Sequence, residues 1–349
     1  MHRPRWLLGV EALCWRVLMR IGMVLHKLPV PRPPSPSFVR TIPSTVSPIP
    51  GSIGLHFYTP HGFTLGQRKG NQYPVVVNFH GGGFTLGSGT DDARWAHAVT
   101  TKTRAVVVSV DYRLAPQYPF PTAVDDGVDA ILYLASHAAE LGIDPSRMAL
   151  SGFSSGGNLA FTVPLKLSQH LRDENDGGEP QRLDTATSSL ARRTGCQIVA
   201  LVAWYPSTDY TRTRAERRAT NIRPDQDLPH YLTDLFDSSY LFGPDFDSSD
   251  PYLSPAVAPT KLLMSLPDQI FIYTAEFDQL RAETQEFSRR LEGELGKKVR
   301  LHMVGERPHA WDKGPNPFMT DPQVEVHYKE ACEELRVVMS EPTALVVEG

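Results

Sequence analysis

Short runs rich in Val, Ile and Leu alternate with longer segments of helical periodicity along most of this 349-residue chain. Several of these runs are continuously apolar, which is typical of strands buried on both faces of a parallel sheet. Strands that alternate with helices predict an α/β fold, with a mainly parallel sheet and helices on both of its faces. The predicted strands are residues 53–59, 74–79, 105–110, 147–152, 197–204, 269–274 and 299–304, and the predicted helices are residues 93–102, 123–141, 157–171, 280–295 and 321–339.

A further helical pattern covers residues 6–26, near the start of the sequence. Its charges at Glu11, Arg16 and Arg20 cost roughly 8–10 kcal/mol at the centre of a membrane, whereas its nine Leu, Ile and Val residues return about 3–5 kcal/mol. The charges therefore disfavour a membrane span, and the two arginines also interrupt the apolar region that a signal peptide needs. We expect an amphipathic helix docked on the protein, with a helix lying on a membrane surface as the alternative.

The rest of the pattern divides the chain into a core and a cap. Residues 209–250 interrupt the alternation of strands and helices with a segment that has aromatic anchors but no strand pattern. We expect this segment and residues 1–47, which hold the first helix and a proline-rich linker, to form a helical cap. Residues 48–208 and 251–349 would then form the core.

Composition narrows the classes of function and the cellular compartment. A net charge of −4 leaves no basic excess for binding nucleic acid. Cys14, Cys196 and Cys332 lie far apart, show neither metal-ligand spacing nor a disulfide pattern, and favour a reducing compartment. We expect a cytoplasmic protein, or one peripheral on an intracellular membrane, and a homodimer is one option for its assembly. The polar stretch at 172–195 is expected to be a flexible surface insertion.

The stretch SGFSSGGN places three serines where a predicted strand meets a predicted helix. Only Ser154 has glycine at both −2 and +2, because Ser151 would still lie in the strand and Ser155 would turn with the helix. A serine on a sharp strand-to-helix turn exposes its hydroxyl oxygen, and small neighbours allow the turn to close. Ser154 is therefore the candidate nucleophile, and a purely structural Gly/Ser turn is the alternative.

A serine nucleophile also needs a base, an acid that orients the base, and donors for an oxyanion. His309 follows the last predicted strand in the loop GERPHAWD, and Asp278 follows the strand before it, so these two are the candidate base and acid. Asp209 is the alternative acid. The glycines of HGGGF at 80–84 follow another strand, and their freedom of backbone rotation allows N–H groups to turn toward a ligand.

Six ordered segments of the chain resemble the hormone-sensitive-lipase-like branch of the α/β-hydrolases, which includes the arylacetamide-deacetylase-like esterases. The resemblance covers residues 48–315, and it implies an α/β-hydrolase fold with a mostly parallel eight-stranded sheet and a helical cap. The segments that carry it are HGGGF, VDYRLAPQYPFP, GFSSGGNL, DPYLSP, AEFDQLRAE and GERPHAW.

The resemblance implies a role for each matching residue. Ser154, Asp278 and His309 would be the nucleophile, acid and base of a catalytic triad. The groups that would stabilise the oxyanion are the backbone N–H groups of Gly81, Gly82 and Ser155. The residues that would support the glycine loop are His80, Asp111, Tyr112 and Arg113.

The chain also departs from the usual pattern of this branch, which has Asp-Ser-Ala where Phe153, Ser154 and Ser155 stand. The aromatic side chains of Phe84, Phe153 and Trp311 are expected to line an apolar substrate pocket. We therefore predict a serine hydrolase of small or medium acyl esters that uses neither a metal nor an organic cofactor. Two other interpretations stay open: an amidase, lactonase or acyl-transfer enzyme with the same triad, and a non-catalytic small-molecule receptor on the same fold.

Overall fold

A computed structural model describes residues 3–66, 72–173, 195–243 and 246–340, so the predicted insertion at 172–195 lies almost wholly outside the described residues. Among the described residues, eight strands form one sheet in the order β1-β2-β4-β3-β5-β6-β7-β8. β1 and β4 both pair with β2 in the antiparallel direction, and all other neighbours are parallel. The strands are β1 Phe38–Pro43, β2 Ser52–Tyr58, β3 Tyr73–Phe79, β4 Val106–Asp111, β5 Ile143–Phe153, β6 Ile198–Trp204, β7 Gln269–Phe277 and β8 Lys298–Pro308.

The predicted α/β fold with a mostly parallel sheet is confirmed, and seven of the eight strands lie where the apolar runs predict them. The eighth, β1, is an edge strand whose side chains are mostly half-buried or exposed and whose last residue is proline. Such a strand leaves no apolar run in the sequence, because its neighbour on one side is solvent.

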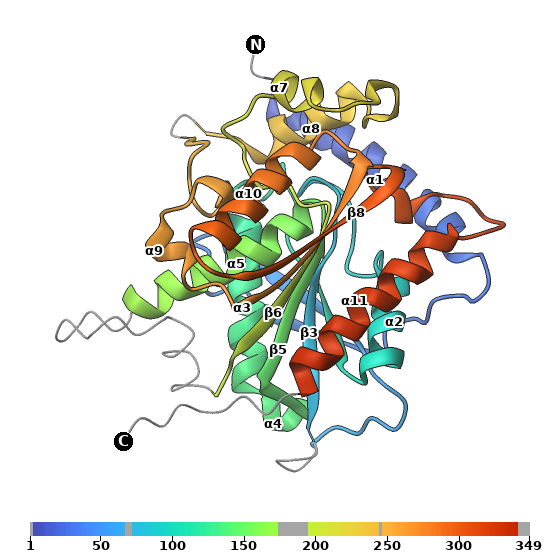
Figure 1. Ribbon diagram of the computed structural model, residues 1–349, viewed down its shortest axis with the longest axis vertical. Helices are drawn as coiled ribbons and strands as arrows, with labels where there is room; N and C mark the ends of the chain where they lie inside the picture. The colour runs from blue at the N-terminus through green and yellow to red at the C-terminus, as the bar shows by residue number, and fades with distance from the viewer. Residues whose placement is uncertain (1–2, 67–71, 174–194, 244–245, 341–349) are drawn as a thin grey trace.

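Helices cover both faces of the sheet, as Figure 1 shows, with α2 and α11 on one face and α3, α5 and α10 on the other. β4 explains the continuous apolar runs: Val106 and Val108 pack into the core beneath α3 and α5, and Val107 packs into the core beneath α2 and α11. Burying each of these side chains contributes roughly 1.5–3 kcal/mol. The helices are α1 Arg5–Lys27, α2 Ala93–Thr103, α3 Thr122–Ser136, α4 Ala138–Leu141, α5 Ser155–Asp173, α7 Arg214–Ala219, α8 His230–Tyr240, α9 Thr260–Leu263, α10 Arg281–Gly293 and α11 Pro322–Ser340.

α1, α7 and α8 gather at one end of the molecule, at the top of Figure 1. Trp15 of α1 stacks on Tyr231 of α8, with their ring centroids 5.2 Å apart. Asn221, between α7 and α8, donates a hydrogen bond to the carbonyl oxygen of Phe277 at the end of β7. These helices therefore lie over the carboxyl ends of the parallel strands. In the part of the chain that the structure describes, no helix is long and apolar enough to cross a membrane.

Candidate active site

Ser154 occupies the turn between β5 and α5 with a left-handed backbone, at φ +54°. Steric contacts require glycine at the two flanking positions, 152 and 156. A Cβ atom on Gly152 would lie 2.0 Å from the carbonyl oxygen of Gly156, and one on Gly156 would lie 2.0 Å from the carbonyl oxygen of Phe79. A positive φ at a residue other than glycine is strained, and it persists only where the surrounding structure holds it. The turn therefore fixes the serine hydroxyl in one place.

The structure brings the three predicted triad residues together. Ser154 Oγ lies 2.8 Å from His309 Nε2, and His309 Nδ1 lies 2.7 Å from Asp278 Oδ2. The backbone N–H of Leu280 donates to the other carboxylate oxygen of Asp278, which is fully buried and so held in a single orientation. Nucleophile, base and acid within hydrogen-bond reach, in this order, form the arrangement that activates a serine.

The other residues weighed for these roles lie elsewhere. Ser151 Oγ donates to Asn78 Oδ1 inside the core, and the Ser155 side chain is buried. The carboxylate of Asp209, the alternative acid, accepts from Thr211 and pairs with Arg212. None of these side chains forms a hydrogen bond with His309.

The glycine loop that follows β3 runs beside the serine turn. A Cβ atom on Gly81 would lie 3.0 Å from the carbonyl oxygen of Phe153, and one on Gly83 would lie 2.2 Å from Cγ of the Phe236 ring from α8. In the described residues, neither Gly81 nor Gly82 donates its N–H to a backbone carbonyl. Ser155 begins α5, so its N–H belongs to the unpaired amides at a helix N-terminus. The loop and the helix thus leave donors free beside Ser154.

His80, Tyr112 and Asp111 hold the glycine loop in shape. His80 stacks on Tyr112 with centroids 4.2 Å apart, and the Tyr112 hydroxyl donates to the carbonyl oxygen of His80. Asp111 accepts a hydrogen bond from the backbone N–H of Gly89 at 2.8 Å. Burial alone would raise the pKa of Asp111, but hydrogen bonding to His56 and the nearby His80 outweigh burial and lower it. The carboxylate form therefore stays available to brace the loop.

Arg113 supports a different part of the fold from the one we predicted. Its guanidinium pairs with the buried carboxylate of Asp126 and also donates to the carbonyl oxygen of Ile49 and the hydroxyl of Ser44. It therefore ties the segment after β1 to α3, and no hydrogen bond joins its side chain to the glycine loop. The sequence alone cannot show this, because Ile49 and Ser44 lie 64 and 69 positions from Arg113 along the chain.

The three aromatic residues predicted to line a substrate pocket are packed into cores, which corrects that prediction. Phe153 is 1% exposed and stacks on Trp204, with the Lys313 ammonium 3.7 Å from its ring centroid. Phe84 is also 1% exposed and stacks on Tyr240 of α8. Trp311 packs in the same core as Phe153. Phe153 ends β5, so its side chain points into the α2/α11 face of the sheet, behind the serine.

A buried charged network behind the serine turn escaped the sequence analysis. Lys313 Nζ lies 2.9 Å from Asp92 and 3.0 Å from Asp312, and both carboxylates are 2% exposed or less. Asp312 accepts hydrogen bonds from the hydroxyls of Tyr205 and Tyr328. Burial alone would raise the pKa of Asp312, but the Lys313 charge and the two hydroxyls hold it below its ordinary value.

The network reaches the candidate base through Tyr205. The Tyr205 ring meets the His309 ring edge to face, with centroids 4.8 Å apart, while its hydroxyl is held by Asp312. Tyr205 follows β6 with a positive φ of 37°. Lys313, Asp312 and Tyr205 thus form one series of contacts that ends at the His309 ring. In the sequence, Asp312 and Lys313 end and follow the HAWD segment, whereas Tyr205 lies 107 positions before Asp312.

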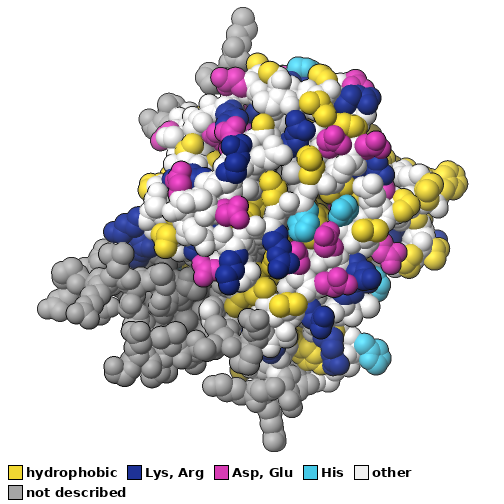
Figure 2. All heavy atoms as spheres, viewed as in Figure 1, with side chains coloured by type: hydrophobic (Ala, Val, Ile, Leu, Met, Phe, Trp, Pro, Cys, Tyr) yellow, Lys and Arg dark blue, Asp and Glu magenta, His cyan; other side chains and the backbone are white. Residues whose placement is uncertain are grey.

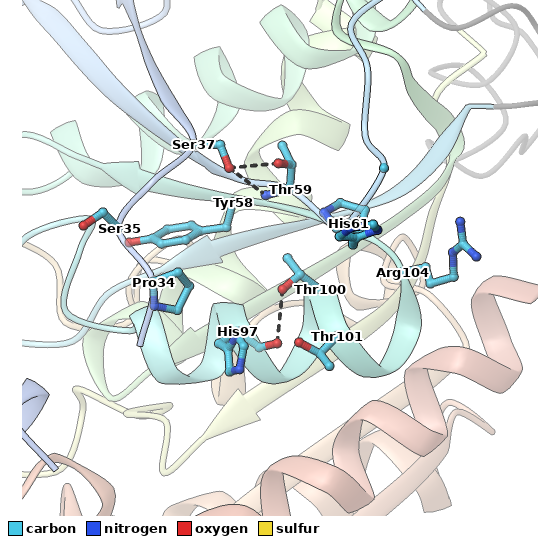
Figure 3. A pocket seen from close by; sticks show the side chains of 12 residues that line it. Pro34, Ser35, Ser37, Tyr58, Thr59, His61, His97, Thr100, Thr101 and Arg104 are labelled. Atoms are coloured by element: carbon cyan, nitrogen blue, oxygen red, sulfur yellow. Dashed lines mark hydrogen bonds between the residues drawn. The ribbon is translucent and has the colours of Figure 1, made fainter. Parts of the chain in front are cut away.

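A cavity of about 590 Å³ lies at the opposite end of the sheet from Ser154. Figure 3 shows it between Tyr58 at the end of β2 and His97 and Thr100 on α2. Tyr58 pairs with Val107 near the start of β4, whereas the candidate active site lies where the parallel strands end. This cavity is therefore not the site of the triad. Among the described residues, no cluster of His, Cys, Asp and Glu side chains could hold a metal ion.

Known proteins are similar to this chain in both fold and sequence. A family profile described as the alpha/beta hydrolase fold matches residues 76–313. The carboxylesterase NlhH of Mycobacterium tuberculosis is 37% identical over 212 residues, which are 60% of this chain and 57% of NlhH. The human arylacetamide deacetylase-like 2 is 35% identical over 147 residues, 40% of this chain and 34% of the human protein.

Among solved structures, the carboxylesterase EstE1, cloned from a metagenomic library, superposes with a TM-score of 0.72 at 28% identity. The superposition covers 95% of this chain and 98% of EstE1. Because the family profile matches more than half of the chain, the chain belongs to the α/β-hydrolase family, in its hormone-sensitive-lipase-like branch. The matched region spans little more than half the length of NlhH.

Proposed function

We propose that this chain is a serine carboxylic-ester hydrolase. The observation that carries the proposal is the continuous set of hydrogen bonds from Ser154 through His309 to Asp278, built on a strained turn that exposes the serine. The names of the similar proteins NlhH and EstE1, both carboxylesterases, support it.

The mechanism follows from the geometry. His309 Nε2 takes the proton from Ser154 Oγ as that oxygen attacks the ester carbonyl, and Asp278 keeps the proton of His309 on Nδ1 and stabilises the charged ring. The alcohol leaves with the proton from His309, and an acyl-enzyme remains on Ser154. A water molecule, activated by the same histidine, then releases the carboxylic acid and restores the serine.

The oxyanion formed in each half-reaction would be stabilised by the N–H groups of Gly81, Gly82 and Ser155. Each such donor contributes about 3–4 kcal/mol to transition-state stabilisation when its position is fixed beforehand. Gly82, at φ 119°, and Ser154 both have positive φ angles. In this proposal, the glycine loop and the serine turn therefore hold these N–H groups in place before the substrate binds.

The substrate is a small or medium acyl ester in this proposal. The helices α1 and α8 would form a cap over the strand ends, since α1 packs on α8 and α8 places Phe236 against Gly83. Because the cap packs this close to the glycine loop, the active site accommodates a short acyl chain more readily than a long one. Cytoplasmic location and homodimer formation stay predictions.

Replacing Ser154 with alanine tests the proposal. We expect Ser154→Ala to lower kcat for a short p-nitrophenyl ester by at least about 10⁴-fold, because the residual rate of a triad enzyme without its nucleophile is small. The matched control is Ser155→Ala, which keeps the backbone N–H and removes a hydroxyl that forms no hydrogen bond with His309. It should retain most of the activity. Retained activity in Ser154→Ala, with an unchanged melting temperature, would show that the nucleophile is misassigned.

A further inference from the structure

The exposed face of α1 is mostly apolar, although Arg5 and Arg20 are also exposed on this helix. Eight hydrophobic side chains of α1 are between 39% and 72% exposed, and they recur at spacings of three and four residues. We call these eight residues the outer face of α1. They are Trp6, Leu7, Val10, Leu13, Val17, Leu18, Ile21 and Val24.

Polar contacts fix which way this helix faces. Arg16 donates to the carbonyl oxygens of Thr85 at 2.9 Å and Ala115 at 2.7 Å, so its charge points toward the glycine loop. At the other end of the helix, Lys27 donates to the hydroxyl of Thr90. The usual arrangement of a surface helix, with polar side chains outward, is therefore reversed for most of α1.

The outer face of α1 forms a contiguous apolar stripe, and such a stripe indicates a binding surface. Scattered hydrophobic side chains are normal on a protein surface, but a contiguous patch marks a site of protein or membrane interaction. A second group of exposed hydrophobic side chains lies next to the outer face of α1. The loop before α11 contacts the helix, with His26 Nδ1 3.3 Å from the carbonyl oxygen of Gly314, and it carries Phe318 at 90% and Met319 at 58% exposed. Hydrophobic side chains gather at the right-hand edge of Figure 2, where this loop lies.

The charges around α1 distinguish between two occupants of the patch. Residues 3–32 contain six basic residues and one acidic residue, and Arg5, Arg20 and Arg32 are exposed, although the whole chain carries a net charge of −4. The acidic residue, Glu11, forms an ion pair with Arg3. A second copy seated on the outer face would bring two positive segments together, whereas anionic lipid headgroups would neutralise them. Trp6, at the start of the patch, is a residue type enriched at membrane interfaces.

We propose that the outer face of α1 docks this protein on the surface of an anionic lipid bilayer. The helix would lie in the plane of the headgroups with its apolar face in the acyl boundary, as interfacial amphipathic helices do. Arg16 would hold it to the glycine loop from below. A consequence that rests on the proposed ester hydrolase is that esters dissolved in the bilayer would enter the site beside α1.

The test is sedimentation of the full chain with large phosphatidylcholine vesicles, with and without phosphatidylserine. We expect the protein to sediment with the phosphatidylserine vesicles and to be released by high salt, because screening removes the headgroup attraction. The variant Leu13→Ser/Val17→Ser should lower the vesicle partition coefficient at least about tenfold, since it removes two large side chains from the apolar contact.

The matched control is Val326→Ser/Val337→Ser, which changes two exposed valines of α11, at 60% and 53% exposed. It should sediment like the wild type. Both variants should retain the wild-type melting temperature and rate on a water-soluble ester, so loss of binding is separated from failure of the fold or of the proposed reaction. A wild-type protein that stays in the supernatant overturns the proposal. So does a wild-type dimer in light scattering that Leu13→Ser/Val17→Ser converts to a monomer without any vesicle binding.

Discussion

Lys313 shows how one side chain can connect the core to the candidate active site. Its ammonium lies between the carboxylates of Asp92 and Asp312 and over the ring of Phe153, the residue before the candidate nucleophile. Its cationic head stabilises two carboxylates that would otherwise be buried without a counter-charge. The aromatic ring directly before Ser154 therefore makes a cation–π contact with the Lys313 ammonium.

Replacing this lysine should destabilise the protein strongly. Lys313→Met leaves Asp92 and Asp312 buried without their counter-charge, and breaking a buried pair in this way costs about 3–5 kcal/mol of unfolding free energy. The measurement is a urea unfolding curve. The control Lys329→Met removes one partner of an ion pair with Glu333 that is 60% exposed on both sides, and it should cost less than about 1 kcal/mol. If both variants lose the same unfolding free energy, Lys313 does not act as the counter-charge of Asp92 and Asp312.

The helix α1 was predicted from its periodicity, and its bounds agree with the prediction to within one residue. The pattern did not reveal which side faces the protein. Leu8, Ala12 and Met23 are buried, but most of the large apolar side chains are outside, because Arg16 and Lys27 find hydrogen-bond acceptors on the core. The expected docked amphipathic helix is thus present with most of its apolar residues turned outward.

The end of α1 should make the stability depend on pH. Burial, and then the charge of Lys313, lower the pKa of His26 from 6.5 to about 4. Between these values the unfolded chain binds a proton that the folded chain does not, so the free energy of unfolding rises with pH. The contribution is complete above about pH 6.5 and is lost as the pH falls toward 4, by up to about 1.4 kcal/mol per pH unit.

Urea unfolding of the wild type and His26→Gln at pH 7.5 and pH 4.5 measures this contribution. The variant should lose less stability between the two pH values than the wild type does, because glutamine does not titrate. His61 is an exposed histidine, so His61→Gln is the control and should keep the wild-type pH dependence. If His26→Gln and wild type lose the same stability, His26 does not titrate as described.

The candidate site exists only when the complete sheet has formed. Ser154, Asp278 and His309 follow β5, β7 and β8, and their contacts join residues up to 155 positions apart in the chain. All three strands run parallel, so their carboxyl ends meet at one edge, where ligands bind in open α/β sheets. α1 and α8 then cover this edge from two distant parts of the sequence.

Removing the acid tests whether this assembly acts as a unit. Asp278→Asn should lower kcat for a short ester by about 10⁴-fold, because asparagine favours the wrong tautomer of His309 while the geometry is kept. Asp209→Asn should change kcat only slightly, since that carboxylate bonds to Thr211 and Arg212 and not to His309. A large loss in Asp209→Asn with little loss in Asp278→Asn would reverse the assignment of the acid.

The sequence by itself determined the α/β class, most strand and helix positions, and the side chains that meet at the candidate site. These features are local: apolar runs and periodicity follow from which faces are buried, and Gly152 is needed by the turn itself. The order Ser154, Asp278, His309 could be predicted because each residue directly follows a strand that the pattern already locates.

Only the tertiary structure decided where side chains point and what they meet. Phe153 turned out to pack against Trp204 and not in a pocket, Arg113 to pair with Asp126 and not with the glycine loop, and α1 to face outward with its apolar side. Each outcome depends on contacts between segments far apart in the chain. Burial and charge pairing are settled by such contacts, and a linear pattern of residue types contains no information about them.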